Sequence, residues 1–453
     1  MENAAKDCMT AKLLRKEIFR LAWPAISEMV LHTAVWIFDT AMVGRLSAEA
    51  LSAVGLGGQL AFTLAFVFAA VGTGGAAMVA RYTGAQERQK ADHVVTQAFL
   101  ISAVIGVFLG AATFLGARTF FSLIMRDPEV VVMGTAYLRI VSIGIFFMIP
   151  TLVMNSALRG AGNTRLPMIS ALVANSINIV GDYVLIFGHF GFPRWEVSGA
   201  AAATTLAQFF GAIITIGYVS RGKNGVRLRF NDIFKIDIPL VKQLIKLSLP
   251  ASLEELSYSG SRLISSLWIA HLGTVAFAAN QVAVSAESMS FMPGYGFSVA
   301  ASSLVGQNLG ARKEKMAETS GWESTKYSLI LMSFIGGVFF LFPGWLMGFF
   351  TDIPGVRELA ARCIRIGAFE QPTIAISMTL SGALKGAGDT KGPFLVSLVS
   401  IWMVRLPLIY TVVFILNKDL AYVWVATVIQ FFVEAVLMGF RFKKGRWKDI
   451  MFE

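Results

Sequence analysis

The chain is poor in charged residues, cysteine and histidine. Of its 453 residues 15% are charged, two are Cys and four are His, whereas 55% are hydrophobic. Soluble domains carry about 25% charged residues, so the composition excludes a cytosolic enzyme and a DNA-binding domain. Cys8 and Cys363 are too few for a secreted disulfide scaffold and do not lie in a metal-ligand spacing. No clustered His, Cys or Ser constellation and no phosphate loop occurs, so we expect no enzyme, no cofactor and no direct use of ATP.

Long uncharged runs take the place of the missing polar residues. Several of them exceed the roughly 20 residues that a helix needs to cross the hydrocarbon core of a bilayer. The polar breaks between the runs predict an all-α, polytopic membrane protein with twelve transmembrane helices. The predicted spans are 18–44, 51–80, 94–117, 130–156, 167–188, 197–219, 246–270, 276–306, 321–347, 359–382, 393–416 and 420–440.

The distribution of the basic residues behind the net charge of +11 indicates how the chain is oriented in the membrane. With a cytoplasmic N-terminus, 27 of the 39 Lys and Arg residues fall on the inner side and six fall in the outer loops. This positive-inside bias predicts that both termini are cytoplasmic. Basic segments on that side suit anionic lipid headgroups, and we expect no nucleic-acid partner. No signal peptide is evident, and the short loops favour a prokaryotic plasma (inner) membrane.

The two halves of the sequence repeat each other. Leu21–Pro24 corresponds to Leu247–Pro250, and Ala157–Pro167 corresponds to Ala383–Pro393, both at a distance of 226 positions. A third pair has the same offset, and later matches lie 222 apart, which puts four extra residues near His189–Phe192. Several matches at one offset indicate an internal duplication of six spans.

Because each copy has six spans, an even number, both copies insert in the membrane in the same orientation. This predicts two lobes that are related by a pseudo-two-fold axis along the membrane normal. Two such lobes suit alternating access, although channels and enzymes also arise by duplication. We expect a monomer. The predicted domains are a cytoplasmic segment 1–17, a first lobe 18–220, a cytoplasmic linker 221–242, a second lobe 243–441 and a cytoplasmic tail 442–453.

Three features of the sequence are the repeated motif Ala-Leu-(Arg/Lys)-Gly-Ala-Gly-(Asn/Asp)-Thr-(Arg/Lys), the pair Pro24 and Pro250, and the segment Asp39–Gly44. In these features the chain resembles the multidrug and toxic compound extrusion (MATE) family. The resemblance extends over roughly Leu21 to Lys448. It implies a secondary active antiporter that exports organic cations and other amphiphiles in exchange for Na⁺ or H⁺. The first alternative is a lipid-linked precursor flippase of the same superfamily, whose members often have 14 spans and a cationic cavity. The second alternative is an integral membrane enzyme.

Ionisable residues within the spans are functional candidates, because a charge at membrane depth is unfavourable. Asp39 lies about 22 Å along the first helix from Pro24, and Asn178 and Asp182, four residues apart, share one face of the fifth span. Carboxylate and amide oxygens suit Na⁺, and Thr204 adds a hydroxyl. The resemblance assigns these residues to the coupling-ion site, with Na⁺ at Asp39, Asn178 and Asp182. The same atoms can instead hold a proton.

The second half of the chain lacks this set of residues. The positions 226 beyond Asp39, Asn178 and Asp182 hold Ser265, Val404 and Leu408. A charged cluster that is kept in one copy of a duplicated scaffold favours a specialised function. The structural alternatives are an Asp39 carboxylate that reaches the outer interface and a hydrogen-bonding role for Asp182.

Other carboxylates within the spans are not part of the predicted coupling-ion site. Glu28 and Glu254 are repeat equivalents one turn after a proline, which favours a structural role. Glu255 has no counterpart, and Glu255 and Glu287 are candidates for attracting a cationic substrate or a second coupling ion. One subgroup of the family carries its second-lobe carboxylate where this chain has Tyr258, which places a second-lobe ion site in doubt.

Two further hypotheses concern pairing and bending within the spans. We expect Arg405 and Glu370 to form a buried ion pair. Pro24 and Pro250 each remove a helical hydrogen bond and are predicted kink sites. The resemblance suggests that a bend at Pro24 follows protonation of Asp39. A static packing kink is the alternative.

Overall fold

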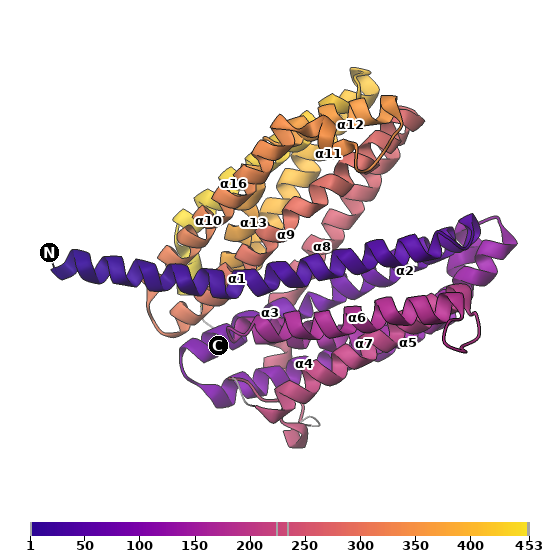
Figure 1. The fold of residues 1–453 in the computed structure, drawn as a ribbon. Coiled ribbons are helices and arrows are strands. Elements are labelled where there is room, and N and C mark those ends of the chain that lie inside the picture. Colours follow the sequence, from indigo (N-terminus) through magenta and orange to yellow (C-terminus); the bar gives the residue numbers. More distant parts are fainter. Residues whose placement is uncertain (1, 223–224, 233–234, 451–453) are drawn as a thin grey trace. The chain divides into compact units, whose positions relative to one another are not determined.

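The computed structural model describes residues 2–222, 225–232 and 235–450, which form helices and short connections without a β-strand (Figure 1). The first six predicted spans are confirmed as helices. They are α1 (Glu2–Val43), α2 (Ala48–Ala69) with α3 (Val71–Gly84), α4 (Arg88–Ile124), α5 (Pro128–Gly160), α6 (Arg165–Phe187) and α7 (Glu196–Arg221).

The remaining six spans follow a linker that contains the short helix η1 (Phe230–Asp232). They are α8 (Ile238–Ala270), α9 (Thr274–Gly310), α10 (Glu314–Leu341), α12 (Pro354–Gly367) with α13 (Gln371–Gly386), a composite span from Lys391 to Ile415, and α16 (Leu420–Lys443). The short helices α11 (Pro343–Met347) and η4 (Arg446–Asp449) lie outside these spans.

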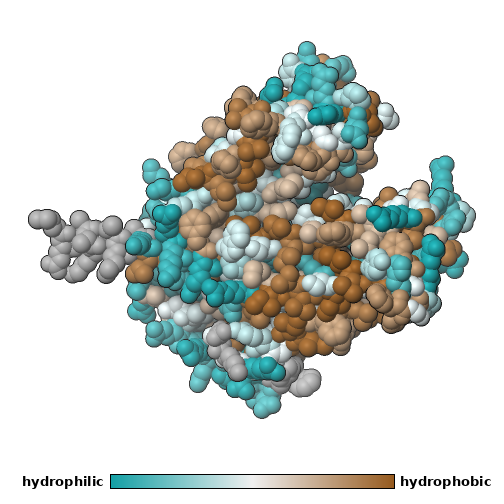
Figure 2. All heavy atoms as spheres, viewed as in Figure 1, coloured by the Kyte–Doolittle hydropathy of each residue, from teal (hydrophilic) through white to brown (hydrophobic). Residues whose placement is uncertain are grey.

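Nine of the described spans are apolar and long enough to cross a membrane by length and composition alone. The other three, α8, α9 and the α12–α13 pair, are richer in polar and small residues. On the face shown in Figure 2, hydrophobic residues cover the middle of the helices and hydrophilic residues gather towards their ends. This distribution matches a surface that is surrounded by lipid between two aqueous layers.

The chain divides into two compact units, and the divisions fall inside helices. The N-terminal unit is Ser27–Ser252, and the C-terminal unit holds the chain from Leu253 onward together with the part before Ser27. The boundaries therefore lie within α1 and α8, two residues after Pro24 and Pro250. Both helices continue through their proline. The predicted lobe limits at 18, 220, 243 and 441 stay a prediction.

Close helix packing builds each unit. In the N-terminal unit α5 packs against α2, α4 and α7, and α6 packs along α7 (Figure 1). In the C-terminal unit α9 packs against α10 and α13, and α13 packs against α16. Glycine allows the close approach: a Cβ at Gly110 would lie 2.9 Å from the carbonyl oxygen of Ser142 on α5.

Three predicted spans are interrupted helices. The second span breaks at Ala70 between α2 and α3, and the tenth breaks at 368–370, directly before α13, whose second residue is Pro372. The eleventh runs through α14 (Lys391–Leu398), the π-helix η2 (Val399–Arg405), α15 (Leu406–Tyr410) and the π-helix η3 (Thr411–Ile415). Pro372 and Pro407 lack the N–H that a continuous α-helix needs, which accounts for two of the irregularities.

The repeated motif binds the glutamates that follow the two prolines. Nη1 of Arg159 lies 3.1 and 3.2 Å from the carboxylate oxygens of Glu28. The equivalent Nζ of Lys385 lies 2.9 Å from Oε1 of Glu254. Glu28 and Glu254 are 3% and 6% exposed, so each buried charge has a partner of opposite sign. The structural role predicted for the two glutamates is thus supported, with a basic side chain as the partner instead of freed backbone groups.

The glycines of the motif are required by geometry. Gly162 and Gly388 have φ angles of 85° and 94°, in the left-handed region that favours glycine. Gly160 and Gly386 face the backbone of Ala76 and Ser302, where an added Cβ would overlap the carbonyl group. Ala76 and Ser302 are also 226 positions apart, so the duplication preserves both the motif and the surface against which it packs.

Removing one partner of a buried pair tests its contribution. Glu28→Gln leaves Arg159 with a charge that its buried neighbour no longer balances, and we expect the free energy of unfolding to fall by about 3 kcal/mol. Thermal unfolding of the purified protein in detergent measures this loss. The double variant Glu28→Gln, Arg159→Gln removes both charges and should be less destabilised than the single variant. A single variant as stable as the unmodified protein would contradict the assignment.

Candidate functional site

The structure brings Asp39 of α1 and Asp182 of α6 together in the N-terminal unit. The two carboxylates are close enough to interact directly with each other. Asp182 is 1% exposed. Among the described residues, no donor hydrogen-bonds to Oδ1 of Asp39 or to either carboxylate oxygen of Asp182. Two carboxylates this close repel each other when both are ionised, so the pair needs a shared proton or a cation.

Asn178 and Thr204 complete the group of oxygens. Nδ2 of Asn178, one turn before Asp182, donates to Oγ1 of Thr204 on α7 at 3.3 Å. Oδ1 of Asn178 is buried, and no described donor reaches it. The structure thus places all four predicted residues together and leaves an oxygen from each of three side chains without a hydrogen-bond donor. An all-oxygen set of this kind fits Na⁺ or a proton.

Small residues hold Thr204 in this position. A Cβ at Gly181 on α6 would lie 2.9 Å from the side chain of Ala203, and a Cβ at Gly199 on α7 would lie 2.6 Å from the carbonyl of Leu185. Larger side chains at these points would push the two helices apart. The predicted role of the small-residue run beginning at Gly199 is consistent with this packing.

Asp39, Asn178 and Thr204 also line a cavity of about 90 Å³ within the N-terminal unit. Its wall is mixed in character, and its ionisable members besides Asp39 are His32 and Tyr137. Apolar and aromatic parts of the wall include Trp36, Phe62 and Met148. The oxygen site therefore opens onto a chamber with aromatic and thioether surfaces.

Sequence reasoning missed several polar residues of this cavity, among them Tyr137, Asn155 and His32. Tyr137 on α5 is 3% exposed and is an electrostatic neighbour of both Asp39 and Asp182. Asn155 lies farther along α5, with Oδ1 3.2 Å from Oγ1 of Thr215. No pattern in the apolar fourth span marks either residue. His32 had a signal, because it precedes Asp39 by seven residues and so shares its helical face.

The C-terminal unit has no equivalent cluster at the corresponding positions. Ser265, which replaces Asp39, is buried, and Leu408 replaces Asp182. Glu434 is bound by three neighbours: Oη of Tyr258 at 2.8 Å, Oγ of Ser400 at 3.0 Å, and Nε2 of Gln430. Tyr258 therefore donates a hydrogen bond to the carboxylate of Glu434. It occupies the position at which one subgroup of the family has a carboxylate of its own.

Glu255 and Glu287 lie in different surroundings. Glu255 is partly exposed, and its electrostatic neighbours include Lys385 and Arg262. Glu287 is 8% exposed and lies near Glu370. Both residues belong to the C-terminal unit, and their predicted roles stay a prediction.

The predicted ion pair between Arg405 and Glu370 is wrong. Nε of Arg405 and both carboxylate oxygens of Glu370 lack a hydrogen-bond partner among the described residues, and no ion pair within 4.0 Å joins them. Arg405 ends the π-helix η2, where the extra residue per turn changes the direction of a side chain relative to an α-helix. Glu370 lies in the break before α13. Pro372 and Pro407 mark the two irregularities in the sequence, but they do not show in which direction the side chains of Glu370 and Arg405 point.

Glycine substitutions in α7 test how closely the site depends on α6–α7 packing. Gly199→Ala places a Cβ against the Leu185 carbonyl, and we expect a loss of about 1–3 kcal/mol in the free energy of unfolding. Gly217→Ala is the matched control on the same helix, because no atom lies within 4 Å of its Cβ position. The control should be neutral or slightly more stable. Equal thermal unfolding of the two variants would contradict the packing argument.

A protein-family model described as MatE matches residues 24–184 and 250–411. The two matches begin 226 positions apart, which is the offset of the internal repeat. The probable multidrug resistance protein NorM of Thermotoga maritima is 32% identical over 438 residues, covering 96% of this chain and 93% of the relative. The uncharacterized transporter YisQ of Bacillus subtilis is 24% identical over 430 residues, covering 95% and 94%.

Solved structures share the fold. A MOP superfamily transporter from Pyrococcus furiosus matches with a TM-score of 0.89 and 22% identity, covering 95% of each chain. A MATE family transporter in an outward-facing conformation matches with a TM-score of 0.88 and 22% identity, covering 96% of this chain and 97% of that one. The family match over both halves, the relative at 32% identity and the twelve-span, two-lobe fold lead to one conclusion: the chain belongs to the MATE family of integral membrane transporters.

Proposed function

We propose that this transporter is a secondary active antiporter that exports small organic cations and other amphiphilic xenobiotics in exchange for Na⁺ or H⁺. Relatives from Thermotoga maritima and Yersinia pseudotuberculosis carry the name multidrug resistance protein, which supports multidrug efflux. These relatives are bacterial, which supports a location in a prokaryotic inner membrane. The direct energy source is the ion gradient.

The observation that carries the ion-coupling proposal is the facing pair Asp39 and Asp182. A proton or Na⁺ that enters the site relieves the repulsion between the carboxylates, with Asn178 and Thr204 supplying further oxygens. The coupling ion therefore binds where buried oxygens of three side chains lack a hydrogen-bond donor among the described residues. Release of that ion on the other side of the membrane restores the repulsion and favours the next binding event.

The lining of the cavity supports an organic cation as the exported substrate. Asp39 belongs to both the oxygen cluster and the cavity wall, so a bound coupling ion and a cationic substrate compete for its charge. Trp36, Phe62 and Tyr137 present aromatic faces, and Met148 adds a flexible thioether, surfaces that suit varied amphiphilic cations. A lipid pyrophosphate would instead require several basic groups on this wall, whose ionisable members are His32, Asp39 and Tyr137.

Fold similarity alone does not decide the substrate. The Pyrococcus furiosus transporter is described as having a binding pocket of reversed polarity, which suggests a different function for that protein. For this chain the proposal therefore depends on the residues of its own cavity. Glu255 and Glu287 are proposed as secondary carboxylates that attract the substrate or a second ion in the C-terminal unit. Pro24 and Pro250 are proposed as the positions where α1 and α8 bend during transport.

Transport by proteoliposomes tests the coupling site. Asp39→Asn and Asp182→Asn each remove one charge of the pair, and we expect gradient-driven export of a fluorescent organic cation to fall at least about tenfold, which corresponds to roughly 1.4 kcal/mol. A Na⁺ gradient and a pH gradient are imposed separately to identify the ion. Ser265→Ala, at the repeat position equivalent to Asp39, is the matched control and should retain transport. Unchanged export by both aspartate variants would refute the assignment.

The same vesicles separate efflux from lipid translocation. A fluorescent analogue of a polyprenyl pyrophosphate, measured by quenching in the outer leaflet, should show no protein-dependent translocation. Translocation of this probe together with absent export of organic cations would favour the flippase alternative.

A further inference from the structure

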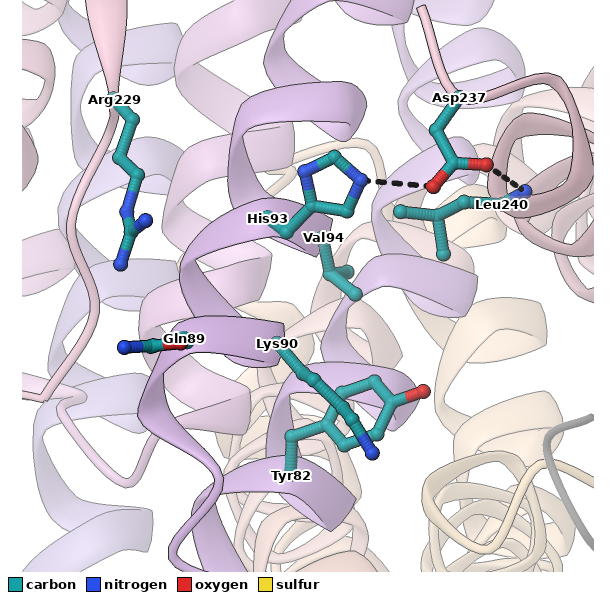
Figure 3. Close-up of a pocket in the computed structure, with 8 residues that line it drawn as sticks. All are labelled: Tyr82, Gln89, Lys90, His93, Val94, Arg229, Asp237 and Leu240. Atoms are coloured by element: carbon teal, nitrogen blue, oxygen red, sulfur yellow. Dashed lines mark hydrogen bonds and ion pairs between the residues drawn. The ribbon is translucent and has the colours of Figure 1, made fainter. Parts of the chain in front are cut away.

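The N-terminal unit has a second cavity, at the end where α3 meets α4. It measures about 380 Å³ and is lined by Tyr82, Gln89, Lys90, His93, Val94, Arg229, Asp237 and Leu240 (Figure 3). The positive-inside bias predicts that this end is cytoplasmic. None of these residues belongs to the Asp39 cluster or its cavity, so the second cavity is a separate site.

The linker after α7 forms one wall of this cavity because it is fixed to α4. The Asp92 carboxylate accepts hydrogen bonds from the backbone N–H of Arg227 at 2.7 Å and from Nη2 of Arg229 at 3.3 Å. Oγ1 of Thr96 accepts from the backbone N–H of Arg229 at 3.1 Å. Gln97 donates to the carbonyl of Lys235 at 2.7 Å. The wall is therefore preorganised rather than a loose surface loop.

The cavity wall carries more positive than negative charge. Lys90 and Arg229 are cations, and their carboxylate partners, Glu87 at 2.8 Å and Asp92, do not line the cavity. Each of these basic groups has further N–H donors, three on an ammonium and five on a guanidinium. Figure 3 shows Lys90 beside Tyr82 on one side and Arg229 on the other, with His93 between Arg229 and Asp237.

Asp237 is the one carboxylate that lines the cavity, and it has partners of its own. Its Oδ2 lies 2.9 Å from Nε2 of His93, and its Oδ1 accepts from the backbone N–H of Leu240 at 3.1 Å. The His93 hydrogen bond, followed by that from Leu240, holds the pKa of Asp237 below its usual value. Asp237 is therefore ionised at neutral pH and directed to His93 and the start of α8, which leaves the basic groups opposite it to face an anion.

Exposed apolar side chains flank the cavity residue Asp237 in the sequence. Ile236 and Ile238, on either side of Asp237, are 63% and 59% exposed. Isoleucines that project outward from a basic segment at the end of a membrane span suit the boundary between headgroups and acyl chains. A soluble anion would gain nothing from these side chains, whereas a phospholipid would contact both the basic groups and the isoleucines.

The duplication shows that the basic lining is not needed to hold the linker. Glu318, equivalent to Asp92, binds Lys448 of the tail at 2.6 Å, so the C-terminal unit fixes its own following segment in the same manner. The lining is not retained: Asn308, Met316 and Thr319 replace Tyr82, Lys90 and His93, and Met451 aligns with Arg229 at the offset of 222. Lys90 and Arg229 thus have no basic equivalents in the second copy, whereas the lining residue Gln89 corresponds to Lys315.

We propose that this cavity binds the phosphate headgroup of an anionic phospholipid from the cytoplasmic leaflet. Lys90 and Arg229 bind the phosphate oxygens, the Tyr82 hydroxyl donates to the headgroup, His93 holds Asp237 away from it, and the acyl chains lie beside Ile236 and Ile238. The bound lipid bridges α4 and the linker and so stabilises the N-terminal unit. The site is independent of the ion-coupling proposal, because no residue is shared between them.

Thermal unfolding of the full chain in detergent, at constant ionic strength, tests the site. The additives are dioctanoyl phosphatidylglycerol, dioctanoyl phosphatidylcholine and inorganic phosphate. We expect saturable stabilisation by phosphatidylglycerol alone. Lys90→Gln should weaken its apparent affinity about fivefold, as loss of one basic group near an anionic lipid does, and Lys90→Arg should retain it. The Lys90 side chain is 62% exposed, so its substitution leaves the fold intact.

Matched controls separate a built site from general surface attraction. Lys315→Gln removes an exposed cation at the equivalent end of the C-terminal unit, and this variant should bind phosphatidylglycerol as the unmodified protein does. An equal loss in Lys315→Gln and Lys90→Gln would overturn the proposal. Equal stabilisation by inorganic phosphate would assign the cavity to a free anion, and equal stabilisation by phosphatidylcholine would show that charge is not recognised. Either result also overturns it.

Discussion

A partner of opposite sign stabilises a charge that is buried at membrane depth, and each compact unit contains such a pair. Glu28 binds Arg159 in the N-terminal unit, and Glu254 binds Lys385 in the C-terminal unit. Asp389, in the loop before α14, accepts two hydrogen bonds from Arg441, at 2.7 and 2.9 Å. Asp39 and Asp182 differ, because they face each other with the same sign. In the proposed mechanism a mobile positive charge balances this pair. A pair that would destabilise an ordinary membrane protein would then serve to bind the coupling ion.

The internal duplication distinguishes scaffold from specialised site within one chain. Features that are present in both copies maintain the fold. They are the glutamate that binds the repeated motif, Glu28 or Glu254, and the acidic residue that binds the following segment, Asp92 or Glu318. Features present in one copy lie at the two candidate sites: Asp39 has Ser265 as its equivalent, and Lys90 has Met316. Both sites lie in the N-terminal unit. The two halves thus pack their helices in the same way, whereas the charged residues at the two cavities occur in the first half and not at the equivalent positions of the second.

The sequence was sufficient for the spans, the repeat and the identity of the four clustered residues, whose roles stay a prediction. These features can be read from spacing along the chain: the hydrophobic runs give the spans, the offset of 226 residues gives the repeat, and the four-residue spacing of Asn178 and Asp182 gives their common helical face. Tyr137 and Asn155 were missed because a helix that is apolar on most faces does not reveal which face borders a cavity. The Arg405 pairing failed because π-helical turns alter side-chain direction without any spacing signal. The docking of the linker depends on Thr96 and Gln97, neutral residues whose partners are backbone groups more than 130 positions away.

The continuity of α1 and α8 through the unit boundaries has a mechanical consequence. The basic linker lies wholly within the N-terminal unit and is fixed to α4, so the chain passes from one unit to the other through helices. A helix transmits rotation and axial displacement, whereas a flexible tether absorbs them. Asp39 lies on the same continuous helix as the residues before Ile26, with the turn weakened by Pro24 between them. A change of charge at Asp39 therefore has a direct path along α1 to the part of the chain that belongs to the C-terminal unit, and that path can bend at the turn that contains Pro24.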